Sequence, residues 1–422
     1  MASHPPRNPG GPSFLFRFPA GGRRIPVGPA GWGWSWRQMG RWLCLFLLLL
    51  FIINLSGCWD RKDIEDLAFI QVLCVDWKEE DGSYQITLEL PRPQEIRLAA
   101  EGGFGQGQTA LLVSGTGKSL SEALAAAKAE FPRYLFLGHI NALIVGEEVA
   151  RAGVEPVLDF FSRHPEFRLR TLLLVSRGPA RAILATRPGV ERNLGAVFDK
   201  EFRQRALVST IPAKMFYEFT EELMEPGVDP HTAGVRPSKE TEAGSINLET
   251  VALFREDRLV GWLEREEAMA FLWLRGESAV SEVVVRDEAS GVKATLEIYN
   301  PVRELKVRPG PTGPLVDFKW RAMARLKEME GAEKFDLALL ERLTDLAEET
   351  IKSRLDRTFA RLQREFHTDS LGLGQELRRS SPRYWQEVAA NWSDVYGELQ
   401  LRSQVKVTLW QAGLSVDPIR AR

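Results

Sequence analysis

Cysteine and histidine are both scarce in this chain, which has three cysteines and five histidines among its 422 residues. Three thiols are too few for the disulfide framework that stabilises small secreted domains. The histidines are scattered at positions 4, 139, 164, 231 and 367, and the sequence contains neither a His-Glu-x-x-His pair nor closely spaced cysteines. The sequence therefore predicts no metal site and no cofactor.

Motifs of known catalytic chemistry are missing as well. The sequence has no Gly-x-Ser-x-Gly elbow of a serine hydrolase. Gly117-Lys118-Ser119 resembles the end of a phosphate-binding loop, but that motif needs a glycine at position 112, where this chain has leucine. We interpret it as a turn before a helix. The Gly-rich segment 102–107 lacks the strand-turn-helix context of a dinucleotide site, so we predict that the protein is not an enzyme.

Acidic residues are absent from the first 57 positions, which hold six arginines. The whole chain has a net charge of −2, so removing these six positive charges leaves −8 for the residues from Cys58 onward. A basic leader before an acidic mature chain is typical of an exported protein. The acidic balance also argues against nucleic-acid binding, which requires a basic surface.

The leader lacks an unbroken apolar run long enough to cross a bilayer, which takes roughly 20 residues. Its run, Trp42–Ile53, spans about a dozen residues, follows two arginines and leads to Leu55-Ser56-Gly57-Cys58. That tetrapeptide has the form of a lipobox: a leucine, two small residues and a cysteine. We predict a lipoprotein signal peptide over residues 39–57 and attachment of Cys58 to the bilayer as an N-palmitoyl, S-diacylglycerol cysteine. The alternative is an uncleaved anchor helix, which would leave the domain on the same side.

Two neighbouring features belong to this leader. Residues 1–38 are rich in glycine, proline, arginine and tryptophan without apolar periodicity, so they cannot build a core. Because a signal peptide of ordinary length would begin at Met39, we interpret residues 1–38 as an over-extended gene start or a disordered N-terminus. Trp59 directly follows the lipid-bearing cysteine, and its indole would lie at the headgroup level of the bilayer.

Strand and helix signals alternate over residues 58–224, which we predict to form an N-terminal α/β domain. A capping box at Ser119–Glu122 indicates the start of one helix. His139 falls in an apolar stretch and is interpreted as a core histidine rather than a ligand contact, and Glu147-Glu148 as a solvated helix start. The expected strands are 67–76, 84–90, 109–113, 139–145 and 169–176, and the expected helices are 119–129 and 147–164.

Three prolines interrupt the polar segment 225–244, which we predict to be a linker or long loop. Beyond it we expect a small β-rich middle domain over 245–300 and a C-terminal α/β domain over 301–418. The strongest helical signal is an apolar stripe at spacings of three and four over 336–366, and an alternating strand is expected over 399–410. The predicted fold class is α+β (mixed α/β) and multi-domain, with mixed sheets each covered by helices and one long amphipathic helix.

Three aromatic residues, Tyr384, Trp385 and Trp392, cluster near the C-terminal end of the chain. We interpret them as core residues, because burial in the core is the commonest role of large aromatic side chains. An aromatic patch that faces a partner subunit is the alternative.

Segments spread in order over almost the whole chain from Cys58 onward resemble the Ger(x)C family of spore germination lipoproteins, the C subunits of germinant receptors in spore-forming bacteria. After the lipobox they are Gly57–Ala68, Leu137–Ile140, Val145–Glu148, Pro156–Phe161, Ala252–Trp262, Leu272-Trp273, Ser381–Trp385 and Asn391-Trp392. One departure is Leu371–Gly374, where the family pattern has aromatics before the glycines. Leucine in place of an aromatic changes the packing and leaves the assignment intact.

The resemblance implies a three-domain α/β protein, lipid-anchored through Cys58 to the outer face of the cytoplasmic membrane that becomes the spore inner membrane. It also implies assembly with a larger A subunit and a membrane-embedded, transporter-like B subunit, in a receptor that responds to small germinants. The implied role is nutrient-triggered germination through protein–protein assembly rather than catalysis. Whether this subunit contacts the germinant stays open.

Two other classes of protein carry the same leader. A solute-binding lipoprotein that delivers a small molecule to a membrane transporter would need a deep cleft between two comparable lobes. A surface hydrolase acting on cell wall or lipid would need a catalytic constellation, and the sequence offers none that we recognise.

Overall fold

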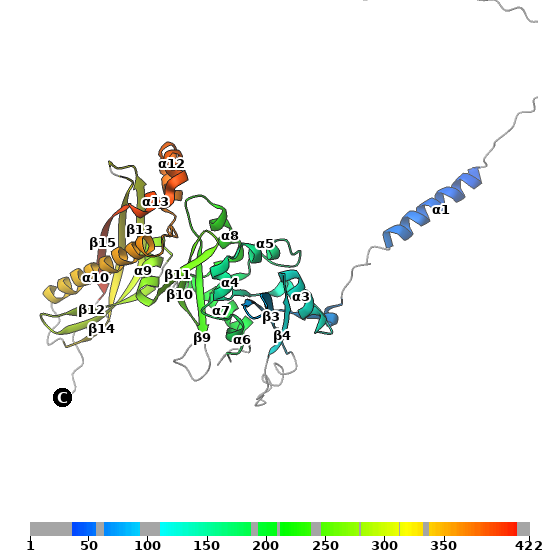
Figure 1. Ribbon diagram of the computed structural model, residues 1–422, viewed down its shortest axis with the longest axis horizontal. Coiled ribbons are helices and arrows are strands. Elements are labelled where there is room, and N and C mark those ends of the chain that lie inside the picture. The colour runs from blue at the N-terminus through cyan, green and yellow to red at the C-terminus, as the bar shows by residue number, and fades with distance from the viewer. Residues whose placement is uncertain are drawn as a thin grey trace, which may run out of the picture. The chain divides into compact units, whose positions relative to one another are not determined.

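Figure 1 shows the computed structural model of the chain, which describes residues 36–55, 63–92, 110–186, 193–208, 212–237, 246–277, 280–311, 313–331 and 337–411. The chain divides into two units, Met1–Lys62 and Asp63–Arg422. The described part of the first unit is helix α1 (Trp36–Leu55), whose side chains are exposed as far as Phe51. None of the described helices combines the length and the apolarity that crossing a bilayer requires.

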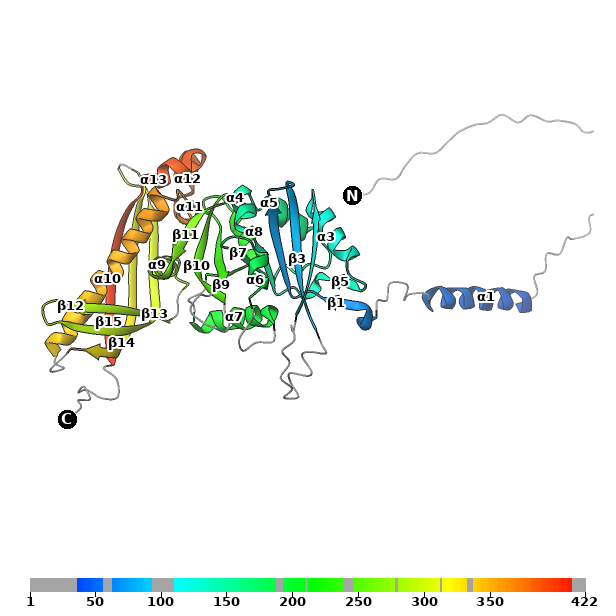
Figure 2. The ribbon, with the colours of Figure 1, turned by 60° about the horizontal axis from the view of Figure 1, so that its bottom comes forward.

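The second unit contains a mixed sheet of nine described strands (Figure 2). Its order is β11-β10-β9-β7-β6-β2-β3-β4, and β8 pairs with β7 beside this path. Strands β2, β6, β7 and β9 pair in parallel, whereas β3, β4, β8, β10 and β11 join antiparallel. The strands are β2 (Val72–Lys78), β3 (Ser83–Pro91), β4 (Ala110–Gly117), β6 (Ala142–Val145), β7 (Leu172–Ser176), β8 (Lys214–Met215), β9 (His231–Pro237), β10 (Ile246–Arg255) and β11 (Arg258–Glu264).

Helices cover both faces of this large sheet. Its central strands are continuous apolar runs, such as the fully buried Ala142–Val145, and a strand of this kind requires cover on both sides. Four helices pack on one face and two on the other. The first four are α3 (Leu120–Ala129), α4 (Glu147–Ala152), α5 (Glu155–Ser162) and α8 (Phe216–Met224), and the other two are α6 (Arg181–Leu184) and α7 (Leu194–Val208).

A two-stranded parallel sheet precedes the large one. Strand β1 (Leu67–Phe69) pairs with β5 (Tyr134–Phe136). The 3-10 turn η1 (Ile64–Asp66) precedes β1, and the 3-10 turn η2 (Leu137–His139) follows β5. His139 lies on η2 and is exposed, so the prediction of a core histidine inside a strand is wrong. The reason is local, because the Ile140 N–H bonds back to the Leu137 carbonyl and closes a turn before β6 begins.

The remaining strands form a second sheet in the order β12-β13-β14-β15. Pairing is antiparallel except between β14 and β15, which run parallel. Helices α9 and α10 cover one face of this sheet (Figure 1), and four short helical segments follow α10. The elements are α9 (Arg265–Arg275), β12 (Val280–Asp287), β13 (Val292–Arg308), β14 (Leu315–Glu330), α10 (Leu337–Arg364), α11 (Leu373–Ser380), α12 (Pro382–Val388), η3 (Ala389–Asn391), α13 (Trp392–Gly397) and β15 (Gln400–Gln411).

The amphipathic helix predicted over 336–366 is confirmed by α10. Every residue of its predicted apolar stripe is buried, from Leu339 to Phe366. The stripe packs against inward-facing residues of the second sheet, among them the fully buried Phe318 and Trp320. A 28-residue helix therefore gains its stability from tertiary packing of one face.

The hairpin of β10 and β11 separates two hydrophobic cores. Val251, Leu253 and Leu263 belong to the core of the second sheet, whereas Ala252 and Phe254 belong to the core under α3, α4, α5 and α8. This alternation follows from the strand period of two, which sends neighbouring side chains to opposite faces. One hairpin therefore joins the two sheets into the single unit Asp63–Arg422.

The helix predicted over 147–164 is wrong at its middle, because the chain forms α4 and α5 with a break between them. Gly153 has φ +131°, a conformation that a helix does not contain. The Val154 N–H bonds to the Asp257 carbonyl. A Cβ at position 153 would lie 2.4 Å from an Asp257 carboxylate oxygen. Pro156 lies in the first turn of α5, where proline needs no hydrogen-bond partner.

The segment 225–244, predicted as a linker or long loop, contains strand β9. Thr232 of this strand is fully buried because it finds a partner inside the sheet: its hydroxyl donates to the Leu173 carbonyl at 2.6 Å. The expected middle domain, 245–300, supplies β10 and β11 to the large sheet and β12 to the second. The division of the chain into domains at the predicted residue numbers stays a prediction.

Candidate functional site

Helix α1 contains the apolar run of the predicted signal peptide. Leu55 is the last residue of that helix. Ser56, Gly57, Cys58 and Trp59 lie outside the described residues. The lipobox, the acylated cysteine and the interfacial tryptophan therefore stay predictions.

The segment that resembles a phosphate loop is a helix cap. The Ser119 hydroxyl accepts a hydrogen bond from the Glu122 N–H at 3.2 Å, and the Glu122 carboxylate accepts one from the Lys118 N–H at 2.8 Å. Both side chains satisfy backbone donors that the start of α3 would otherwise leave open. The Ser119 half of the predicted capping box is confirmed, whereas Glu122 reaches the N–H of Lys118 in place of that of Ser119. In the part of the chain that the structure describes, no three His, Cys, Asp or Glu side chains come together to hold a metal ion.

Four charged residues, each partly buried, and one fully buried histidine meet where the two cores adjoin, and we call these five residues the junction cluster. Lys214 is on β8, Glu222 on α8 and His231 on β9, while Arg275 ends α9 and Glu277 follows it. His231 is fully buried, with Nδ1 3.2 Å from Glu222 Oε2 and Nε2 3.7 Å from Glu277 Oε2.

The two cations of the junction cluster bridge the same two carboxylates. Lys214 Nζ lies 3.2 Å from an oxygen of each glutamate, Glu222 and Glu277. Arg275 contacts Glu222 at 2.6 Å and Glu277 at 3.0 Å, and also donates to the Ser370 carbonyl at 2.8 Å. Since Ser370 follows α10, the cluster ties the second sheet's half of the unit to the large sheet.

Electrostatics explains why the junction cluster can be buried. Burial alone would raise the pKa of Glu222 and Glu277, but their contacts with His231, Arg275 and Lys214 outweigh it and hold both pKa values well below the usual range. Burial opposes the charge of Arg275 too, yet the two glutamates raise its pKa. The cluster is thus charged and paired, as buried ionic groups must be.

Sequence reasoning missed the junction cluster entirely. Lys214 and Glu277 are 63 positions apart, and of the five residues only Arg275 and Glu277 are close together in the sequence. His231 was counted among scattered histidines, although it is the fully buried one. Its position in a proline-rich polar segment gave no signal of burial.

A second buried polar contact joins the loop before β9 to the turn after α10. The Asp369 N–H donates to the Asp229 carboxylate at 2.7 Å. The Asp369 carboxylate accepts from Leu373 N–H at 2.9 Å, from Gly374 N–H at 2.8 Å and from the Trp392 indole at 3.0 Å. Burial raises the pKa of Asp369 to about 7 despite these donors, and the charge of Asp229 adds to the effect.

The C-terminal aromatic residues pack in the core of the second sheet, and Trp392 among them donates to that carboxylate. Trp385 is 8% exposed, and its ring centroid is 5.3 Å from that of Trp392 in an edge-on arrangement. Tyr384 and Trp392 are half-buried against the same core. Core packing is therefore confirmed for Trp385. The Leu371–Gly374 segment lies here too, and the fully buried Leu373 fills the core.

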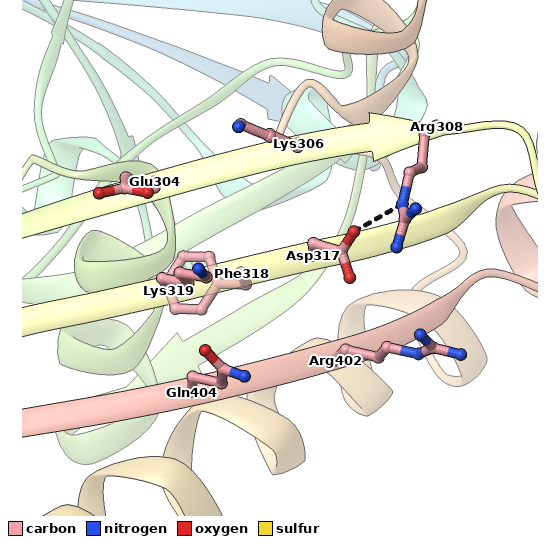
Figure 3. Close-up of a pocket in the computed structure, with 8 residues that line it drawn as sticks. All are labelled: Glu304, Lys306, Arg308, Asp317, Phe318, Lys319, Arg402 and Gln404. Atoms are coloured by element: carbon pink, nitrogen blue, oxygen red, sulfur yellow. Dashed lines mark hydrogen bonds and ion pairs between the residues drawn. The ribbon is translucent and has the colours of Figure 1, made fainter.

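The uncovered face of the second sheet carries a charged cavity of about 480 Å³ (Figure 3). Figure 3 shows Lys306 and Arg308 on β13, Lys319 on β14 and Arg402 on β15, with Glu304 and Asp317 between them. Arg308 Nε lies 2.7 Å from Asp317 Oδ2. Such a lining of both signs suits binding through complementary charge.

Comparison with known proteins gives matches over both halves of the unit. Residues 60–237 match the family described as "Spore germination protein N-terminal domain". Residues 249–413 match the family described as "Spore germination B3/ GerAC like, C-terminal". The two matches follow each other in order and leave only a short interval between them.

Individual proteins are similar over nearly their full length. The chain is 27% identical over 379 residues to YfkR, a candidate spore germination protein of Bacillus subtilis (strain 168), covering 87% of this chain and 96% of YfkR. It is 24% identical over 400 residues to the spore germination protein YndF of the same organism, with the same coverage of 87% and 96%.

A solved structure supports the fold. The crystal structure of the GerBC protein has a TM-score of 0.52 and 20% sequence identity to this chain, and covers 82% of this chain and 99% of that one. Together with the mixed sheets and their covering helices, this similarity confirms the predicted α+β fold class.

Proposed function

The chain belongs to the Ger(x)C family of spore germination proteins, and on that premise we propose that it is the lipid-anchored subunit of a spore germinant receptor. One observation carries the proposal: the N-terminal and C-terminal family matches occur in order over residues 60–413. The relatives that cover the chain are spore germination proteins by name. A role in germination is thus supported for the whole unit rather than for one motif.

The anchor in this proposal is the acylated Cys58. It is supported by the sequence pattern of an apolar run, a lipobox and a cysteine, which precedes the first family match at residue 60. Two or more acyl chains on one cysteine give stable attachment, whereas one chain gives reversible attachment. The protein would then stand on the outer face of the spore inner membrane, beside membrane-embedded partners.

We further propose that the subunit acts by assembly with the A and B subunits of the receptor and not by catalysis. The charged face with the 480 Å³ cavity is a surface of the kind that recognises a partner through complementary charge. The titratable groups of the junction cluster are engaged with one another at the join of the two cores. They serve the fold there and are not presented to a substrate.

The test of the anchor is Cys58→Ala, with Cys44→Ala as the matched control. Cys44 is an exposed cysteine of α1 inside the predicted signal peptide, so its loss leaves the mature chain unchanged. We expect Cys58→Ala to lose the lipid-modified N-terminus, to leave the membrane fraction and to slow germination, while Cys44→Ala behaves as wild type. The measurements are intact mass of the mature protein, membrane fractionation and germination rate. An N-terminus upstream of residue 58 in the purified wild type would contradict the proposal.

The test of the partners is co-purification from spore membranes under mild detergent. We expect the A and B subunits to be recovered with the wild-type chain and to be lost with Cys58→Ala. Recovery of a transporter alone, together with thermal stabilisation of this chain by an amino acid or sugar, would instead support the solute-binding alternative.

A further inference from the structure

A basic pocket of about 360 Å³ opens between η2, the loop before β7, and helix α7. We define it by five of the polar residues that line it: His139, Arg168, Arg170, Asp199 and Arg203. Arg168 and Arg170 are exposed and form no ion pair with another described residue, whereas Arg203 lies 3.0 Å from Asp199. With three arginines against one aspartate, the pocket is positive in a chain whose mature part is acidic.

An exposed leucine lies beside the basic pocket, next in sequence to two of the residues that line it. Leu169 stands between the two unpaired arginines and is 48% exposed. An exposed leucine flanked by arginines is the combination found on surfaces that touch a membrane, where the guanidinium groups meet phosphates and the apolar side chain enters the headgroup layer. Arginine suits this role because its planar fork gives two parallel hydrogen bonds to one phosphate.

The basic pocket lies at the end of the unit where the chain leaves the proposed anchor. Cys58 precedes β1 by nine positions, so a fully extended tether spans about 30 Å at most. The Phe69 ring of β1 is 5.0 Å from the His139 ring on the pocket wall. In Figure 2, β1, β5 and α7 lie along the same lower side of the unit. A tether of this length keeps this side close to the bilayer.

We propose that the basic pocket binds the phosphate of an anionic phospholipid headgroup and so fixes how the unit stands on the membrane. The proposal rests on the lipid-anchored function above and extends it from attachment to orientation. Because the acyl chains already supply attachment, the contribution of the pocket is to select one docked orientation among those that the tether allows. Charge complementarity favours a phospholipid surface over an uncharged one.

An acidic cavity elsewhere on the unit supplies the internal comparison. Glu155, Asp159, Glu256 and Asp257 line a cavity of about 420 Å³ between α5, α8 and the β10–β11 turn. Met224 lies on that cavity and is 73% exposed. An anionic bilayer repels four carboxylates, so this side should face away from the membrane. Leu169 and Met224 are therefore matched exposed positions with opposite expected environments.

The experiment uses the full acylated protein, purified from membranes and reconstituted on vesicles of phosphatidylcholine alone or mixed with phosphatidylglycerol. Leu169→Cys and Met224→Cys each receive a fluorophore, and brominated lipids report contact by quenching. Labelling is selective, because Cys58 carries lipid and Cys74 is buried. We expect quenching at 169 only, and only with phosphatidylglycerol. Arg168→Gln and Arg170→Gln should each lower the docked-to-undocked ratio about fivefold.

Each outcome separates the pocket from the anchor. Loss of the protein from all vesicles would mean that the anchor itself has failed. Retention with equal quenching at 169 and 224 would overturn the docking proposal while leaving the anchor intact. If position 169 were shielded from solvent in spore membranes but not on vesicles, the pocket would be assigned to contact with a partner protein. If inorganic phosphate alone occupied the pocket as well as the vesicles do, the pocket would be a site for a free anion. Either result overturns the lipid assignment.

Discussion

The protonation of Asp369 links the fold to pH at the scale of one residue. Burial raises the pKa of this carboxyl to about 7, whereas in an unfolded chain it titrates near about 4. Between these values the folded protein binds more protons than the unfolded chain. The free energy of unfolding therefore falls as pH rises from about 4 to about 7.

We expect Asp369→Asn to flatten this part of the pH dependence, because an amide does not titrate. At pH 5 the variant should be less stable by about 1 kcal/mol, since the NH2 group of the amide accepts no hydrogen bond from the backbone donors, whereas both oxygens of the protonated carboxyl group can accept. At pH 8 the deficit should shrink or reverse, because the wild type then holds a buried charge. Urea unfolding at a series of pH values measures both effects.

Glu89→Gln is the matched control for that titration. Burial also raises the pKa of Glu89 to about 7, but Glu89 accepts from the Leu194 N–H in another core. The Glu89→Gln variant should lose the part of the pH dependence that is due to Glu89 and keep the part that is due to Asp369. An Asp369→Asn variant with the full wild-type slope would show that this carboxyl does not titrate as inferred.

Two histidines show what the sequence can predict about single residues. His139 has apolar neighbours along the chain and is exposed, whereas His231 lies in a polar, proline-rich segment and is fully buried. The difference comes from partners far away in the sequence, since His231 is enclosed by Glu222, Glu277 and the ring of Phe271 at 4.9 Å. Local composition does not contain that information. The capping box at Ser119 was predictable because its partners are three and four residues apart.

At the scale of elements, the contact between α3 and β4 depends on a residue without a side chain. Gly115 of β4 lies directly under α3, and a Cβ there would be 2.2 Å from Ala127 N and 2.3 Å from Ala123 O. Both contacts are with helix backbone, which a rotamer change does not relieve. The helix can approach the sheet this closely because the strand offers glycine at the crossing point.

We expect Gly115→Ala to lower the free energy of unfolding by about 1–3 kcal/mol, because the helix must move away from the strand. Gly397→Ala is the control: nothing lies within 4 Å of its added Cβ, and alanine favours a helix by up to about 1 kcal/mol over glycine. Urea midpoints of the two variants provide the comparison. Equal midpoints would mean that α3 does not press on β4 at this glycine.

The elements that sequence reasoning found are those with a periodic pattern of their own. The stripe of α10 and the alternation of β3 and β15 are local signals, and the elements formed where they were expected. The break between α4 and α5 depends on Gly153 meeting Asp257, and β9 forms because β7 and β10 offer open edges on both sides. These causes are tertiary, and neither a propensity nor a period along the chain reports them.

At the scale of the whole molecule, the junction cluster holds the large sheet and the second sheet together. Arg275 is its central cation, with a side chain 13% exposed and in contact with Glu222, Glu277 and the Ser370 carbonyl. Removing one partner of a buried ion pair destabilises a protein by more than the intact pair stabilises it relative to apolar packing. The reason is that the remaining charge stays buried without a partner. The cluster is therefore a point where one substitution should affect both halves of the unit.

We expect Arg275→Met to lower the free energy of unfolding by about 3–5 kcal/mol. Arg325→Met, which breaks the half-exposed contact of Arg325 with Glu297 on the second sheet, should cost about 1 kcal/mol or less. Scanning calorimetry and urea unfolding compare the two. If both variants lost the same small amount, the junction cluster would contribute no more than a surface ion pair.

The same substitution has a predictable effect at acid pH. The low pKa values of Glu222 and Glu277 contribute stability that is present above the ordinary glutamate pKa and is lost only as pH falls through the folded values. Without Arg275 those folded values rise, so Arg275→Met should unfold at a higher pH than the wild type. Adding Glu222→Gln removes one of the two stranded carboxylates and should restore part of the acid resistance. The charges that remain in the cluster of the double variant are balanced. If the double variant were as acid-sensitive as Arg275→Met, the cause of the acid sensitivity would therefore lie outside the cluster.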